Sequence, residues 1–120
     1  MTQLGSRTPG VVGAVFDSDS VTAELICDGF HIAPATLRIA FQLLGEDRSV
    51  IVSDAMMASG LADGDFELGG QKVYVRDGKA LLADGTIAAS TTNLYDEFRN
   101  VLRFGIPFRQ ALKSCTINPA

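Results

Sequence analysis

LICDGFH (residues 25–31) and VIVSDA (residues 50–55) are two short apolar runs that each stop at polar groups. The segment between them, residues 35–44, carries apolar residues at helical spacing. This order predicts a β-α-β unit, whose crossover makes the two strands parallel. We therefore expect His31, the only histidine of the chain, and Asp54 at the carboxyl edge of one sheet, where α/β proteins place their chemistry.

The middle of the chain changes to a β pattern. Residues 65–68, 71–76 and 79–82 are predicted to form short antiparallel strands, and Asp77-Gly78 is typical of a type I′ hairpin turn. This β-hairpin excursion, residues 65–82, is inserted after the second strand of the β-α-β unit. It is placed to edge a site at the end of that strand.

Helices are expected on either side of these strands. Residues 1–10 form a polar loop that leads into one or two helical turns at residues 11–16. Asn93 is the predicted N-cap of a helix that ends near Phe104, and a last helix runs from Pro107 to about Ser114.

The composition is that of an ordinary globular domain, with 47% hydrophobic and 20% charged residues, and it allows one domain at most. A net charge of −4 with scattered Lys and Arg argues against a nucleic-acid partner. The chain has no apolar run of about 18 residues and no signal-peptide pattern, so we expect no membrane partner and a cytoplasmic location. Cys27 and Cys115 have no metal or redox spacing and are expected to be free thiols.

Two residues are candidates for chemistry from their positions alone. Asp54 follows an apolar strand and has no cation near it in sequence, which favours an acid/base role. A helix or turn cap is an equally compatible role for an aspartate there. His31 is either a partly buried structural residue or a site residue, and one imidazole cannot build a metal site.

Five blocks of the sequence, RTPG (7–10), DGFH (28–31), VSDA (52–55), LGGQKVY (68–74) and TINPA (116–120), resemble a known family in order and spacing. That family is N-acetylglucosamine-6-phosphate deacetylase, a metal-dependent amidohydrolase on a (β/α)8 barrel, and the blocks match its later part. The resemblance implies an α/β fold in which residues 1–120 form a partial (β/α)8 TIM barrel, its last strands and helices. A complete barrel takes about 250 residues, so we expect an internal segment of a longer enzyme.

The resemblance also assigns roles at the sheet edge. It implies that Asp54 accepts a proton from the attacking water and delivers it to the departing amine. It implies that His31 contacts the sugar phosphate and polarises the scissile amide carbonyl, a task for which an imidazole donor is suited. Asp28, Gly29 and Phe30 would shape the adjoining wall of the site.

Two further substrate contacts rest on the resemblance. Arg7 is implied to reach the substrate phosphate from the neighbouring subunit of a dimer, and its planar guanidinium fits that group. Ala88, Ala89 and Ser90 precede the predicted cap at Asn93, so their amides and the Ser90 hydroxyl are candidate ligand contacts near a helix N-terminus. A plain loop is the alternative there, and the family usually has Gly where Ala89 stands.

The resulting functional hypothesis is a segment of an enzyme that hydrolyses N-acetylglucosamine 6-phosphate to glucosamine 6-phosphate and acetate. The intact enzyme is implied to hold a divalent metal of the zinc or iron type whose ligands lie outside this chain, so the segment alone is expected to be inactive. Association as a homodimer, or with the rest of the barrel, is expected. The alternatives are a non-catalytic sugar-phosphate-binding fragment and a structural piece that completes a barrel with another chain.

Overall fold

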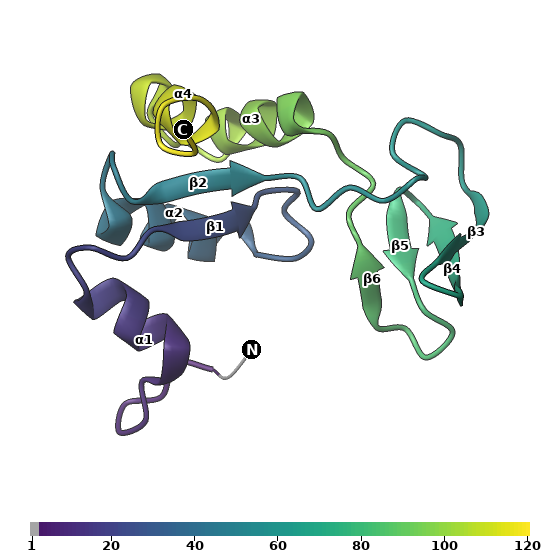
Figure 1. Cartoon of the computed structure of the whole chain (residues 1–120), viewed down its shortest axis with the longest axis horizontal. Coiled ribbons are helices and arrows are strands. Elements are labelled where there is room, and N and C mark those ends of the chain that lie inside the picture. Colours follow the sequence, from purple (N-terminus) through teal and green to yellow (C-terminus); the bar gives the residue numbers. More distant parts are fainter. Residues whose placement is uncertain (1–2) are drawn as a thin grey trace.

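The computed structural model describes residues 3–120, so Met1 and Thr2, the start of the predicted polar loop, lie outside the described residues. The predicted β-α-β unit is confirmed: β1 (Ala23–Ile26), α2 (Pro34–Leu44) and β2 (Ser49–Val52) follow one another. β1 and β2 pair in parallel, with Ala23 opposite Ser49 and Ile26 opposite Val52. Both strands therefore end at the same edge (Figure 1).

The crossover helix α2 has a clear start and end in the sequence. Pro34 occupies the first helical turn, where its missing N–H is not needed. Gly45 ends the helix with φ of 68°, a conformation that glycine adopts without steric cost, and its N–H donates to the carbonyl of Phe41.

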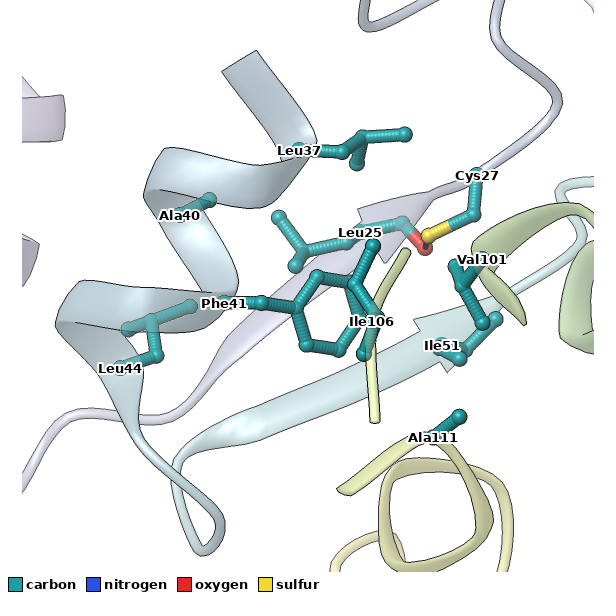
Figure 2. Close-up of a cluster of buried hydrophobic side chains, with 10 residues drawn as sticks. All are labelled: Leu25, Cys27, Leu37, Ala40, Phe41, Leu44, Ile51, Val101, Ile106 and Ala111. Carbon is teal, nitrogen blue, oxygen red and sulfur yellow. Dashed lines mark hydrogen bonds between the residues drawn. The ribbon is translucent and has the colours of Figure 1, made fainter. Parts of the chain in front are cut away.

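The remaining helices are α1 (Gly10–Asp17), α3 (Leu94–Arg103) and α4 (Phe108–Cys115). The predicted cap is confirmed, because the Asn93 side chain accepts the N–H of Asp96 at 3.0 Å. Side chains from β1, β2, α2, α3 and α4 meet in one buried cluster (Figure 2). Its members include Leu25, Phe41, Ile51 and Val101, so the strand pair and three helices share a single core.

The excursion forms a second, separate sheet with strand order β3-β4-β5-β6. Its strands are β3 (Gly64–Leu68), β4 (Gln71–Arg76), β5 (Lys79–Leu81) and β6 (Ile87–Ala89), and all neighbours are antiparallel. The predicted turn is confirmed, since Asp77 and Gly78 have φ of 52° and 69°. Figure 1 shows this sheet beyond the carboxyl ends of β1 and β2.

Strand β6 was not predicted from the sequence, where Ala88 and Ala89 were candidate ligand contacts with a plain loop as the alternative. The strand has only three residues and contains two alanines, so it shows no alternation of polar and apolar positions. It forms because Ala89 pairs with Ala80 of β5. The pairing with β5 joins two separate segments, so the local sequence of β6 does not indicate it.

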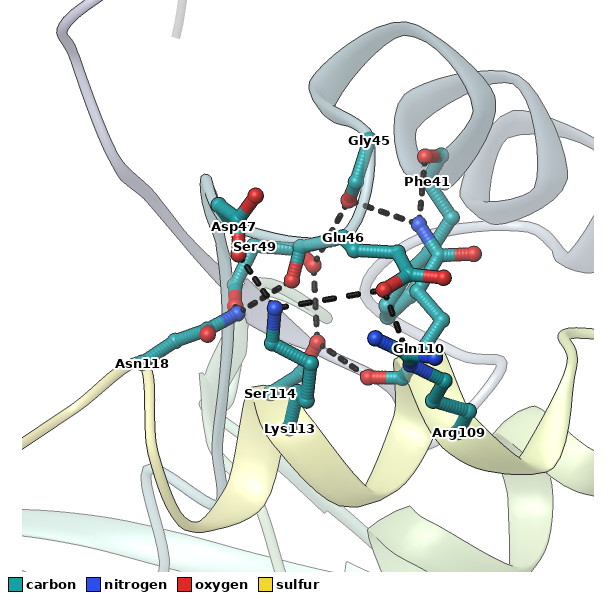
Figure 3. A network of polar contacts seen from close by, with 10 residues as sticks. All are labelled: Phe41, Gly45, Glu46, Asp47, Ser49, Arg109, Gln110, Lys113, Ser114 and Asn118. Carbon is teal, nitrogen blue, oxygen red and sulfur yellow. Dashed lines mark hydrogen bonds and ion pairs between the residues drawn. The ribbon is translucent and has the colours of Figure 1, made fainter.

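Helix α4 is fastened to the α2–β2 connection by a polar network (Figure 3). The side-chain amide of Gln110 donates to the carbonyls of Phe41 and Gly45, each at 2.7 Å. The hydroxyls of Ser49 and Ser114 lie 2.7 Å apart and are buried. The Gln110 amide thus gives the carbonyl of Gly45, at the end of α2, a donor and adds a second donor to the carbonyl of Phe41, which already accepts the N–H of Gly45.

The fold class is thus mixed α/β, with two small sheets that do not close on themselves. Among the described residues, no helix has the length and apolar character that crossing a bilayer requires.

Candidate functional site

The loop after β1 is organised by Asp28. One oxygen of its carboxylate accepts the backbone N–H groups of Phe30 and His31, each at 2.8 Å. Gly29 between them has φ of 79°, and a Cβ at this position would lie 2.9 Å from the ring of Phe104. The shape of this loop therefore depends on a short polar side chain and on a glycine.

The same carboxylate orients the imidazole of His31. Its second oxygen lies 2.7 Å from Nδ1 of His31, and the two side chains are only 9% and 16% exposed for Asp28 and His31. A carboxylate only accepts hydrogen bonds, so Nδ1 carries a proton and Nε2 is left for a ligand. Nε2 accepts in the neutral imidazole and donates in the imidazolium form.

Asp54 follows β2 in a conformation that is rare for a residue with a side chain. Its φ is 48°, and its carbonyl accepts the N–H of Ser90 at 3.0 Å. The side chain is exposed and makes no hydrogen bond or ion pair within residues 3–120. A cap role needs such a bond, so the described residues give no support to a cap, and the acid/base role of Asp54 stays a prediction.

Ser90 joins the two sheets. It pairs with Ala55 in a parallel bridge, in which the Ser90 N–H donates to the carbonyl of Asp54 and the Met56 N–H donates to the carbonyl of Ser90. Its hydroxyl lies 2.6 Å from that of Thr92, and the residue is 2% exposed. The Ser90 amide is therefore not free for a ligand, in contrast to the expectation from sequence, and Ala88 and Ala89 belong to strand β6.

Glu97 is a buried acid at the start of α3 that the sequence reading missed. The residue is 0% exposed, one carboxylate oxygen accepts the hydroxyl of Thr92, and the other has no partner within the described chain. Burial raises the pKa of Glu97 to about 7, and the charge of Asp28 adds to this rise, while the Thr92 hydroxyl and His31 oppose it. Helical spacing contained the signal, because Glu97 stands three residues after Leu94 and four before Val101, which places the three residues on one face of a helix.

Both cysteines are free, as predicted. Cys27 is the last residue before Asp28 and is buried, and this burial raises the pKa of its thiol. A buried thiol with a raised pKa is unreactive, so Cys27 contributes packing at the base of the site.

Arg7 is exposed in the loop before α1 and makes no hydrogen bond or ion pair within residues 3–120. Helix α1 leads into the amino end of β1, and Figure 1 shows it away from the loops that follow β1 and β2. The structure thus brings His31 and Asp54 to one edge but does not bring Arg7 to them within this chain.

A metal ion has no ligand set in the part of the chain that the structure describes. Within it, no group of three or more His, Cys, Asp and Glu side chains is arranged to hold one. The divalent metal that the resemblance implies therefore does not fit these residues, and no chemical step of this chain is derived through it.

Comparisons with known proteins identify the class to which this site belongs. The chain is 39% identical to N-acetylglucosamine-6-phosphate deacetylase of Bacillus subtilis over 104 residues, 87% of the chain and 26% of that protein. It is 34% identical over its whole length to an Escherichia coli K12 protein with the provisional name N-acetylgalactosamine-6-phosphate deacetylase, of which it covers 72%. No protein-family model matches the chain.

Solved structures agree with these sequence matches. N-acetyl-D-glucosamine-6-phosphate deacetylase of Mycobacterium smegmatis, an aspartate-to-alanine variant in complex with N-acetyl-D-glucosamine 6-phosphate, matches the whole chain with a TM-score of 0.94 at 36% identity. The Thermotoga maritima enzyme matches 98% of the chain with a TM-score of 0.93 at 34% identity. The chain spans 33% of each of these two structures.

These matches define a class of hydrolases that remove acetyl groups from phosphorylated amino sugars. Within this class, the chain belongs to the family that contains the N-acetylglucosamine-6-phosphate and N-acetylgalactosamine-6-phosphate deacetylases. It spans about a quarter to a third of the length of most of the curated relatives it matches.

Proposed function

We propose that the chain supplies the proton-transfer group and part of the substrate wall of an enzyme that hydrolyses N-acetylglucosamine 6-phosphate to glucosamine 6-phosphate and acetate. The observation that carries the proposal is that His31 and Asp54 follow two parallel strands that end at the same sheet edge. Asp54 presents a carboxylate without a protein partner among residues 3–120, and His31 presents Nε2 because Asp28 holds Nδ1. The family of the chain gives these groups a matching reaction.

The proposed chemistry balances around Asp54. The oxygen of a water molecule attacks the amide carbonyl carbon, and Asp54 accepts the proton that this water loses. The bond between carbon and nitrogen then breaks, and Asp54 delivers the proton to the leaving amine. His31, as imidazolium, donates from Nε2 to the substrate, either to the developing oxyanion or to the phosphate.

The proposed setting is a (β/α)8 barrel to which residues 1–120 contribute one segment, with residues 65–82 as the inserted excursion. The parallel β1–β2 pair has open edges on both sides, and large apolar side chains are exposed on the helices, among them Ile39, Leu43, Tyr95 and Phe108. Such surfaces are typical of contacts with further chain. In this setting the metal ligands lie outside the described residues, and Arg7 serves the site of a neighbouring subunit.

A non-catalytic role as a sugar-phosphate-binding fragment is the second candidate. Such a fragment would bind through Arg7 and His31 and would need no metal, which agrees with the lack of a metal-ligand group among the described residues but does not by itself separate it from the first function. Turnover separates the two functions, because a binding fragment keeps affinity without hydrolysis in any assembly.

The test is complementation in trans. The chain is co-produced with the part of the Bacillus subtilis relative that lies outside the matched region, and release of acetate from N-acetylglucosamine 6-phosphate is measured. That relative's own matched segment, supplied in the same way, is the control for assembly. We expect acetate release with either segment. Acetate release with the relative's own segment, but none with this chain, would refute the proposal.

A further inference from the structure

The hairpin sheet brings a cation to the edge of the candidate site. Lys79 is the first residue of β5, and it is followed by Ala80, which pairs with Ala89 of β6. Ser90 comes next in the chain and pairs with Ala55 in the parallel bridge. Two backbone pairings, one from Ala80 to Ala89 and one from Ser90 to Ala55, therefore link the strand of Lys79 to the segment of Asp54.

The Lys79 side chain also reaches the loop after β1. Its Nζ lies 4.9 Å from the centroid of the Phe30 ring, a cation–π contact. The Phe30 ring in turn stands edge-on to the His31 ring, with centroids 6.0 Å apart. An ammonium held by an aromatic face keeps its N–H groups available to another partner, so this contact positions Lys79 without consuming its donors.

The hairpin turn that precedes Lys79 is held by hydrogen bonds to two other segments of the chain. The Asp63 carboxylate accepts the N–H of Asp77 at 2.6 Å and that of Gly78 at 3.2 Å. The hydroxyl of Thr91 donates to the carbonyl of Gly78. A residue on a fixed strand end holds its position better than one on a free loop, which suits a binding contact.

The carboxylates at this edge would repel an anionic ligand unless a cation lies near them. Asp28 and Asp54 are both there, while the proposed substrate carries a phosphate with a charge of about −1.5 to −2 near pH 7. Lys79 has no ion-pair partner within residues 3–120. Its ammonium is therefore available to offset the repulsion between these carboxylates and an anionic ligand.

We propose that Lys79 is a substrate-binding residue of this site and takes the phosphate group of the amino-sugar phosphate. The inference rests on the proposed function and deepens it, because it adds a phosphate contact from the same chain as His31 and Asp54. It also gives the inserted sheet a direct part in substrate selection.

The test measures binding to the chain by two-dimensional NMR titration, with N-acetylglucosamine 6-phosphate and unphosphorylated N-acetylglucosamine as probes. We expect the wild-type chain to prefer the phosphorylated sugar. Lys79→Met lowers the affinity for the phosphorylated sugar roughly tenfold and reduces the preference by the same factor, because a charge-assisted bond to phosphate is lost, whereas Lys79→Arg retains both. Lys72→Met, on the exposed part of β4, is the matched control and leaves both affinities unchanged.

Each other outcome has a separate meaning. Equal affinities for wild type and Lys79→Met, with the preference intact, overturn the role of Lys79 and leave the proposed function standing. An equal loss of affinity for both sugars overturns the assignment to the phosphate. No binding of either sugar by the wild-type chain overturns the substrate wall of the proposed function, and the Lys79 contact with it. Unfolding curves of each variant show whether the fold is intact.

Discussion

Replacing Glu97 by glutamine should change how the stability of the chain depends on pH. The folded state raises the pKa of this carboxyl from 4.5 to about 7, with burial as the main cause. Between these two values the folded chain holds a proton that the unfolded chain releases. The free energy of unfolding contributed by Glu97 therefore falls as pH rises through this window and stays low above pH 7.

The size of the effect follows from the two pKa values. With about 1.4 kcal/mol for each pH unit between them, ionised Glu97 destabilises the fold above pH 7 by roughly 3 kcal/mol relative to pH 4.5. Glutamine keeps an oxygen for the Thr92 hydroxyl but cannot ionise. Its amide nitrogen takes the place of the oxygen without a partner, which adds a cost of about 1–3 kcal/mol that does not vary with pH.

Urea unfolding followed by far-ultraviolet circular dichroism at pH 5, 6, 7 and 8 measures this difference. We expect the wild type to lose stability relative to Glu97→Gln across the series, by roughly 3 kcal/mol in total. Glu67→Gln, at an exposed position of β3, is the control and should follow the wild type at every pH. Parallel curves for wild type and Glu97→Gln would refute the assignment of a buried, proton-binding carboxyl.

Three other substitutions test the site and its support. In the complemented enzyme, Asp54→Asn should keep substrate affinity and reduce the rate by about 10²–10⁴-fold, because the amide cannot accept a proton; a loss below about tenfold would exclude proton transfer by Asp54. Arg7→Ala should raise KM with little change in kcat, since the phosphate is remote from the bond that breaks, and a fall in kcat alone would contradict this. Gln110→Leu leaves the carbonyls of Phe41 and Gly45 without their side-chain donor and should lower the free energy of unfolding by about 2 kcal/mol in urea, whereas the exposed Gln42→Leu should change it little.

The sequence was sufficient for elements whose signals are local. The β-α-β unit was predictable because Pro34 and Gly45 mark the ends of its helix and because a short crossover has only one common handedness. The hairpin turn at Asp77-Gly78 was predictable because both residues accept a positive φ. The placement of His31 and Asp54 at one edge was also predictable, because each follows one strand of a parallel pair.

Features that depend on contacts between distant segments were beyond the sequence. Strand β6 exists through its pairing with β5, and the bridge from Ala55 to Ser90 joins residues that are far apart in the chain. The contact between Lys79 and Phe30 depends on both. Glu97 is a different case. Its helical spacing from Val101 was visible in the sequence, but a charged residue is seldom fully buried, so its burial was not predicted.

The inserted sheet has a direct effect on the geometry of the proposed acid/base residue. Asp54 has a positive φ, which costs a residue with a side chain about 1 kcal/mol or more, and such a conformation persists only where the surroundings fix it. Ser90 fixes it from both sides, through the carbonyl of Asp54 and the N–H of Met56. Met56 then packs with Val73 and Val75 of β4 in the core of the inserted sheet. His31 is positioned by the loop after β1 and Asp54 by this second sheet, so the distance between imidazole and carboxylate depends on how the two sheets are joined at Ser90.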